Sequence, residues 1–183
     1  VVDGDIHTAN QHAAGLETRD QAKTFIYAFI FGAGAAKIGQ VVGGDAKQGQ
    51  KLIDTFLKNT PSLAIFRKKV DKASQRGYLV GVDGRHLIIR NRHAAVNLLI
   101  QGAGAVICKQ WLVNINQLTR ENKLDARLVA SIHDEYQHEV SIKHSKLFGE
   151  LTRKAMKQTE KDLNILCPLD SEYKIGNTWA DTH

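Results

Sequence analysis

The chain has 183 residues, 43% of them apolar, which suits one ordinary domain or two small lobes and excludes global disorder. Its two cysteines, Cys108 and Cys167, lie in apolar stretches without metal-binding spacing, which excludes a disulfide scaffold and a zinc site and fits a reducing compartment. No uninterrupted apolar run approaches the roughly 18 residues of a membrane helix, so we expect no contact with a membrane.

The net charge of +6 is unevenly distributed along the chain. Residues 61–120 carry 10 basic and 2 acidic side chains, whereas residues 1–60 carry 6 of each and residues 121–183 carry 9 basic and 11 acidic ones. One third of the chain therefore holds the whole basic excess. Such a concentration favours a surface that binds a polyanion such as nucleic acid.

Helices dominate the predicted elements of the first half. Thr18 followed by Gln21 is typical of a capping box, and it opens an amphipathic helix over 18–31 that Gly32 and Gly34 end. Further predicted elements are a helix over 45–58, a basic helix over 61–76 that starts at Thr60-Pro61, and a hairpin over 78–90 whose two-residue turn is Asp83-Gly84.

The second half mixes one long helix with short strands. Apolar residues at steps of 3 and 4 predict a helix over 93–118, with Asn97 and Gln101 together on another side. A hairpin over 127–142 carries the turn His133-Asp134-Glu135, followed by a helix over 144–162 and a short strand near 169–175. Helices with scattered hairpins indicate an α+β fold rather than alternating βαβ units.

Two groups of residues have the composition of a chemical site. Adjacent acids at a tight turn, Asp134 and Glu135, repel each other unless a cation such as Mg²⁺ takes their oxygens. On the helix over 18–31, Arg19, Lys23 and Tyr27 are spaced i, i+4, i+8, so two cations and a flat ring share one stripe suited to a polyphosphate and its sugar. Each group alone is equally compatible with a solvated acidic turn or a solvated cationic helix edge.

Together these segments resemble family A DNA polymerases, those like DNA polymerase I. Arg19-x3-Lys23-x3-Tyr27-x3-Phe31-Gly32 resembles the family's motif B, and Ile132-His133-Asp134-Glu135 resembles its motif C. Gly4-Asp5-Ile6-His7, Asp83-Gly84-Arg85, Asn97-x3-Gln101-Gly102 and the end Gly176-Asn177-Thr178-Trp179-Ala180-Asp181-Thr182-His183 occur in the family's order. The resemblance covers the whole chain and points to replicative polymerases of short-tailed phages.

The resemblance implies roles for these residues. His7, Arg19, Lys23 and Tyr27 are expected to bind the incoming dNTP, with Tyr27 facing its sugar. Asp134 is expected to ligate the catalytic metals, Glu135 to support that site, and His133 to contact the primer end. The residues expected at the primer-template DNA are Phe31, Gly32, Arg85, Asn97, Gln101 and His183. Two Mg²⁺ ions are the expected cofactors of the complete active site.

The sequence departs from the family pattern at several places. Phe31 stands where the family usually has Tyr, and His93 stands where bacterial members have Arg. The resemblance also implies that motif A, with a second metal-binding Asp, lies upstream of Val1, together with the thumb. We therefore expect a fragment that is inactive by itself and whose partners are primer-template DNA, dNTPs, the upstream polymerase and, as a further candidate, a processivity factor.

The predicted organisation is a fingers subdomain over 1–92 and a palm portion over 93–183 of a right-hand polymerase truncated at its amino end. The expected reaction is template-directed DNA synthesis in the cytoplasm of the host cell of a phage. Two alternatives stay open at this point. One is a catalytically incomplete DNA-binding piece of a split or remnant polymerase. The other is a metal-dependent phosphohydrolase, which the dipeptide His133-Asp134 superficially resembles.

Overall fold

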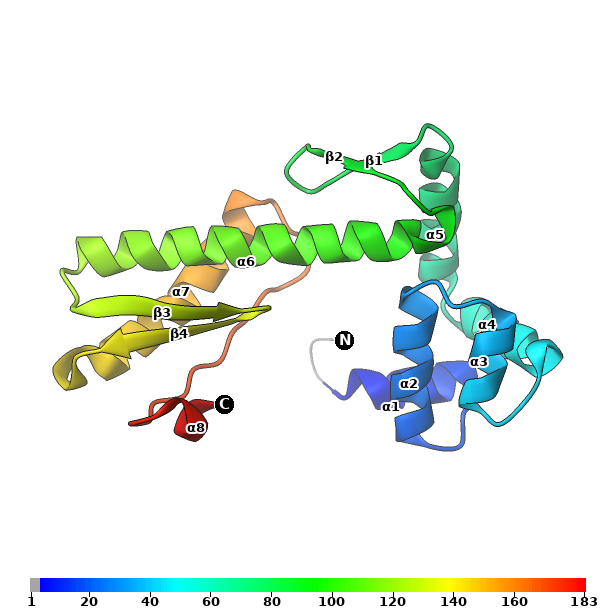
Figure 1. Cartoon of the computed structure of the whole chain (residues 1–183), viewed down its shortest axis with the longest axis horizontal. Coiled ribbons are helices and arrows are strands. Elements are labelled where there is room, and N and C mark those ends of the chain that lie inside the picture. Colours follow the sequence, from blue (N-terminus) through cyan, green and yellow to red (C-terminus); the bar gives the residue numbers. More distant parts are fainter. Residues whose placement is uncertain (1–3) are drawn as a thin grey trace. The chain divides into compact units, whose positions relative to one another are not determined.

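The computed structural model describes residues 4–183, which divide into two compact units (Figure 1). Unit 1 runs to Gln101 and unit 2 comprises Gly102–His183. The predicted boundary at 92/93 falls inside unit 1, and the division into fingers and palm stays a prediction. Helices with two small antiparallel hairpins make the chain an α+β protein, as the sequence predicts.

Five helices form most of unit 1. They are α1 (Ile6–Ala14), α2 (Arg19–Ile30), α3 (Ala35–Val41), α4 (Ala46–Asn59) and α5 (Pro61–Ser74). Capping boxes begin α2 at Thr18 and α4 at Asp45, because in each the side chain three residues on bonds back to the cap. The predictions for α2, α4 and α5 are confirmed, whereas the sequence analysis missed α1 and α3, which are too short to show a clear helical period.

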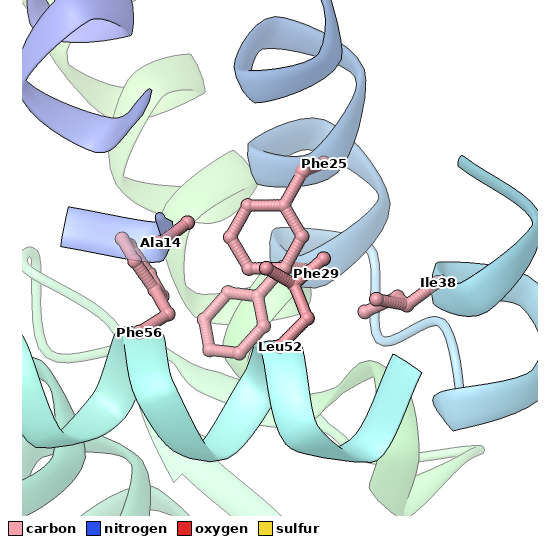
Figure 2. Packing of buried hydrophobic residues seen from close by; sticks show 6 residues of the cluster. All are labelled: Ala14, Phe25, Phe29, Ile38, Leu52 and Phe56. Carbon is pink, nitrogen blue, oxygen red and sulfur yellow. The ribbon is translucent and has the colours of Figure 1, made fainter. Parts of the chain in front are cut away.

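Three phenylalanines form the core of unit 1 (Figure 2). The ring centroids of Phe25 and Phe29 on α2 lie 5.1 and 5.3 Å from that of Phe56 on α4, and both pairs meet edge to face. This is the preferred geometry of aromatic pairs. Ala14 of α1, Ile38 of α3 and Leu52 of α4 complete the cluster, so one face of the predicted amphipathic helix α2 is buried against three other helices.

Glycines let α3 and α4 approach closely. A Cβ added at Gly49 of α4 would overlap the carbonyl oxygen of Ala35 and the backbone nitrogen of Gly39, both on α3. A Cβ at Gly39 would in turn overlap the carbonyl oxygen of Asp45. Only glycine fits at these two positions without moving the helices apart.

The basic helix α5 is less exposed than the sequence suggests. The guanidinium of Arg67 lies 4.4 Å from the centroid of Phe29, and burial lowers the pKa of Arg67. Arg67 therefore covers the aromatic core, while Lys68, Lys69 and Lys72 remain exposed.

The hairpin of unit 1 pairs β1 (Tyr78–Val80) with β2 (His86–Ile88), and Val80 faces His86. The predicted two-residue turn at Asp83-Gly84 is wrong. The Gly84 N–H donates to the Gly81 carbonyl, the Gly81 N–H donates to the Arg85 carbonyl, and Gly84 has φ +81°. Asp83 and Gly84 are thus the third and fourth residues of a longer loop, 81–85, in which Gly84 supplies the left-handed residue.

The long predicted helix is confirmed as α6 (Ala95–Glu121), preceded by a 3₁₀ turn, η1 (Arg92–Ala94). Its first residues belong to unit 1 and the remainder to unit 2. Within the described residues, the segment Arg92–Glu121 is the one helix long and apolar enough to cross a membrane by length and composition, with a mean hydropathy of 1.3 over 18 residues. The segment contains no long uninterrupted apolar run, because polar residues and Lys109 stand between its apolar ones. The expectation of no membrane contact stays a prediction.

Unit 2 packs a hairpin and a helix against the rest of α6. Strand β3 (Ala126–Ile132) pairs with β4 (Glu135–Val140), and the chain continues through η2 (Ile142–His144), α7 (Ser145–Asp162) and α8 (Trp179–Thr182). Its core consists of Trp111, Ile115, Phe148, Ala155 and Met156. The indole N–H of Trp111 donates to the carbonyl of Thr152 at 2.8 Å, which ties α6 to α7.

The predicted strand near 169–175 is wrong. Residues 168–176 have neither helix nor strand, and the two hairpins account for all strand pairing in the described part of the chain. Side chains anchor this segment instead. The Glu160 carboxylate accepts the Leu169 N–H at 2.7 Å, and the Tyr173 hydroxyl donates to Glu150 at 2.7 Å. The segment therefore makes its hydrogen bonds to side chains of α7, where a strand would make them to a neighbouring strand.

We expect Gly49→Ala to destabilise the fold by about 1–3 kcal/mol, because the new methyl group forces α3 away from α4. Gly104→Ala is the matched control. Gly104 is exposed on α6 with open space around its Cα, so alanine should raise stability by about 0.5–1 kcal/mol through helix propensity. Urea unfolding followed by circular dichroism measures both. Equal stability of the two variants would contradict the close packing at Gly49.

Candidate functional site

The predicted nucleotide-binding residues of α2 share an exposed stripe. Phe25 and Phe29 fix the opposite side of the helix in the core. Arg19, Lys23 and Tyr27 therefore point outward, and Tyr27 is 51% exposed although it is aromatic. Arg19 is the first residue of α2, where unpaired backbone N–H groups and the helix dipole add to its positive charge.

A carboxylate that the sequence analysis did not assign joins this stripe. Asp5 accepts hydrogen bonds from the Nε of Arg19 and, at 3.2 Å, from its Nη2, so the pair is bidentate. The hydroxyl of Thr8 also donates to Asp5, at 2.8 Å. These donors, Arg19 first, hold the pKa of the Asp5 carboxyl well below its ordinary value. No signal in the sequence pointed to this role, because α1, the helix that Asp5 caps, is itself too short to be predicted.

His7 lies beside the same stripe. Its ring centroid is 6.1 Å from that of Tyr27, and its backbone N–H donates to Asp5 at 3.2 Å. Its Nδ1 is buried and has no hydrogen-bond partner among the described residues. The structure thus brings together His7, Arg19 and Tyr27, while Lys23 stands one turn from both Arg19 and Tyr27 on α2.

The residues predicted to contact DNA lie on several elements of unit 1, except His183, which belongs to unit 2. Phe31, at the end of α2, is 54% exposed, which suits stacking. Gly32 has φ +80° and a Cβ there would overlap the carbonyl oxygen of His93, so this glycine serves a close approach of two backbone segments. Arg85 forms an ion pair with Asp83 in the β1–β2 loop.

Asn97 and Gln101 stand one turn apart near the start of α6. Gln101 is exposed, and the Asn97 Oδ1 is buried without a partner among residues 4–183. A buried amide oxygen is normally hydrogen-bonded, so this atom is available to a donor that the chain does not supply.

The acidic turn in unit 2 joins β3 to β4 by two residues, since Ile132 faces Glu135 in the register. His133 has φ +53°, a left-handed conformation that costs a residue other than glycine about 1–2 kcal/mol. Strained backbone of this kind clusters at functional sites. The result is that His133 and Asp134 are both exposed at the tip of the hairpin.

The carboxyl-terminal residues dock on Glu135. Gln137 donates to Glu135, and the Nδ1 of His183 lies 3.3 Å from the Glu135 Oε2. These contacts, Gln137 first and His183 after it, lower the pKa of Glu135. Thr182 also donates to the Gln137 side chain at 3.2 Å. His183 thus lies beside the acidic turn, and Gln137 is a second residue that the sequence analysis missed.

Asp134 is the residue of this turn best suited to a metal ion. Among residues 4–183, no hydrogen bond or ion pair to its carboxylate is found, whereas Glu135 is already engaged. Oxygen ligands of this kind fit Mg²⁺, which binds through one or two carboxylates and keeps its waters. The described residues contain no cluster of three or more possible metal ligands.

A cavity of about 980 Å³ opens beside the turn, entirely within unit 2. Asp134 and Glu135 line it together with Trp111, His138 and residues 172–179 of the carboxyl-terminal segment. The predicted nucleotide residues and the acidic turn belong to different units. Unit 1 therefore presents a cationic, aromatic stripe, and unit 2 presents an acidic turn beside a cavity.

Comparisons with known proteins point to one family. A family model described as DNA polymerase family A matches residues 3–181. The DNA-directed DNA polymerase of Escherichia phage Phieco32 is 40% identical over all of this chain and 31% of its own length, and that of Escherichia phage T7 is 39% identical over all of this chain and 29% of its own. DNA polymerase I of Bacillus caldotenax is 25% identical over 97% of this chain and 21% of its own length.

The chain thus spans about a third of the length of the phage relatives it matches. Among solved structures, the POL domain of Pol1 from M. smegmatis, in complex with DNA primer-template and dNTP, has a TM-score of 0.76. It is 23% identical and covers 85% of this chain and 31% of that one. At this identity the likeness concerns the fold.

We expect Gln137→Ala to raise the pKa of Glu135 toward its ordinary value of about 4.3, because the variant removes the principal donor to the carboxylate. The stabilisation by ionised Glu135 is complete above about pH 4.3 and is lost as the pH falls through the lower folded pKa; the variant should lose less stability on acidification. Carboxyl ¹³C shifts followed by NMR measure the titration. Asp162 of α7 is the internal control, and an unchanged Glu135 titration would exclude the interaction.

Proposed function

Since the chain belongs to DNA polymerase family A, we propose that it supplies the nucleotide-binding helix and part of the metal site for template-directed DNA synthesis. A primer 3′-hydroxyl attacks the α-phosphate of a dNTP in this reaction, and pyrophosphate leaves. The observation that carries the proposal is the exposed stripe of Arg19, Lys23 and Tyr27, with His7 beside it. For a phage-encoded chain the compartment is the cytoplasm of the host cell.

The stripe accounts for recognition of the dNTP. Arg19 offers N–H donors in a planar fork and Lys23 a point charge, and both neutralise the triphosphate and the pyrophosphate that leaves. His7 adds a donor at the same end of α2, and Tyr27 presents its ring to the sugar. Such groups act by positioning and by charge neutralisation, as phosphoryl transfer requires.

The acidic turn accounts for the metal. Asp134 holds Mg²⁺ directly, Glu135 supports the site, and His133 contacts the primer end. Two Mg²⁺ ions, when bound, lower the pKa of the attacking hydroxyl and stabilise the leaving oxygens. His183, which lies beside Glu135, brings its imidazole to this end of the palm.

The remaining residues are proposed to hold primer-template DNA. Asn97 and Gln101 face the minor groove, whose acceptors are common to all base pairs, so correct pairs of any sequence are accepted. Phe31 and Gly32 contact the template near the new pair, and Arg85 contacts the backbone. The basic excess of residues 61–120 supports this assignment, since phosphate contacts dominate the affinity for DNA.

A catalytically incomplete DNA-binding piece is the second candidate function. It is favoured by the single acidic pair of the described residues, because two metals need carboxylates from two motifs. Primer extension by the purified chain, with and without an upstream polypeptide carrying motif A and the thumb, distinguishes the two. Extension only after that polypeptide is added supports a split active site. The same assay with a candidate processivity factor tests that partner.

In a full-length polymerase that carries this chain, Asp134→Ala should abolish nucleotide incorporation and leave primer-template affinity nearly unchanged, because it removes a metal ligand and no phosphate contact. Single-nucleotide extension and DNA affinity are measured in parallel. Glu139→Ala, an exposed acid on the same hairpin, is the control and should behave as the parent. Extension by the Asp134 variant within about tenfold of the parent would remove this residue from the metal site.

Lys23→Ala should lower kcat/KM for dNTP roughly 10- to 100-fold, since it deletes a charge-assisted contact to the triphosphate. DNA affinity should stay the same. Lys37→Ala, which removes an exposed lysine from α3, controls for the loss of charge. A change confined to DNA affinity would mean that the stripe faces the duplex.

A further inference from the structure

We propose that Asp5 is a positioning residue for nucleotide binding, which fixes the Arg19 guanidinium and the first turn of α1 in a single arrangement. The inference rests on the proposed function of Arg19 and His7. It adds a residue that contacts neither DNA nor dNTP and acts through its neighbours. Three residues, His7, Thr8 and Arg19, donate hydrogen bonds to this one carboxylate.

The Asp5–Arg19 pair leaves part of the guanidinium free. Asp5 takes the Nε–H and one Nη2–H, which are two of the five N–H donors of an arginine. Among residues 4–183 the other three, including both on Nη1, have no acceptor, and they can bind an anion. A bidentate pair also fixes the plane of the guanidinium, so an exposed side chain that otherwise samples many rotamers is held in one. Arg19 is half exposed, so its free edge is accessible.

The same carboxylate organises the start of α1. It accepts the backbone N–H of His7 as the helix N-cap and the hydroxyl of Thr8. The ring of His7 follows this turn and lies beside Tyr27 of α2. One side chain therefore connects groups from two helices that the proposed function assigns to the same dNTP.

Contrast with another ion pair of unit 1 shows what is unusual here. Arg92 donates to Asp71 through a single hydrogen bond of 3.1 Å, and Asp71 is 70% exposed. Asp5 is 37% exposed and has four donor atoms around it. Simple exposed pairs of the Arg92–Asp71 kind contribute little to stability or order. Asp71 thus supplies a matched control for the loss of one carboxylate charge.

The test uses Asp5→Asn in a full-length polymerase that carries this chain. Asparagine keeps the size and the helix cap but loses the charge that holds Arg19. We expect KM for dNTP to rise about tenfold, with kcat within about threefold and DNA affinity unchanged. Asp71→Asn should match the parent in all three. Asp5→Ser, which keeps a capping oxygen too short to reach Arg19, should reproduce the rise in KM and secures the test if asparagine misfolds.

A double-mutant cycle separates this role from a general structural one. On an Arg19→Ala background, Asp5→Asn should have no further effect on KM, whereas on a Lys23→Ala background its effect should persist. Equal effects on both backgrounds would overturn the inference. So would a lower KM for Asp5→Asn, because it would mean that Asp5 competes with the triphosphate for Arg19. If Arg19→Ala itself leaves dNTP kinetics unchanged, the proposed function fails and the inference with it. If Arg19→Ala impairs dNTP kinetics but Asp5→Asn leaves KM as unchanged as Asp71→Asn does, the inference alone fails.

Discussion

Edge-to-face packing of Phe25 and Phe29 against Phe56 is the interaction on which the candidate nucleotide site depends. It fixes the rotation of α2 about its own axis, because two aromatic side chains one turn apart must both enter the same core. With that face buried, Arg19, Lys23 and Tyr27 have only the outward side left. The stripe is thus exposed because the opposite face of α2 must be buried. A helix rotated by one residue would bury one of its cations.

In unit 2 the feature that matters is the exposure of one acidic residue, Asp134. A two-residue turn places Asp134 at the tip of a hairpin, at the cost of a left-handed His133. The neighbouring acid is treated in the opposite way, since Gln137 and His183 engage Glu135 and keep it ionised. Two adjacent carboxylates are thereby distinguished: Glu135 has hydrogen-bond partners, and Asp134 has none among residues 4–183.

How far the sequence predicts the structure depends on the range of the interactions involved. The helices α2, α4 and α7 and the β3–β4 hairpin follow from periodicity, capping residues and turn residues, all of which act within a few positions. The helices α1 and α3 are too short for such a signal. The segment 168–176 is not a strand because no neighbouring strand within residues 4–183 pairs with it. The site residues His7, Arg19 and Tyr27 could be found from family motifs. The contacts of Asp5 with Arg19 and of His183 with Glu135 join residues 14 and 48 positions apart, and no local pattern encodes them.

The close approach at Gly32 has a mechanical consequence. The backbone at the end of α2 touches that of His93 with no room for a side chain between them, so this end of the helix cannot advance further. A change that tilted α2 about Gly32 would therefore move the opposite end of the helix, where Arg19 stands, the most. Phe31, which lies next to the point of contact, would move the least. The same glycine that ends the helix would thus set which of its side chains move and which stay.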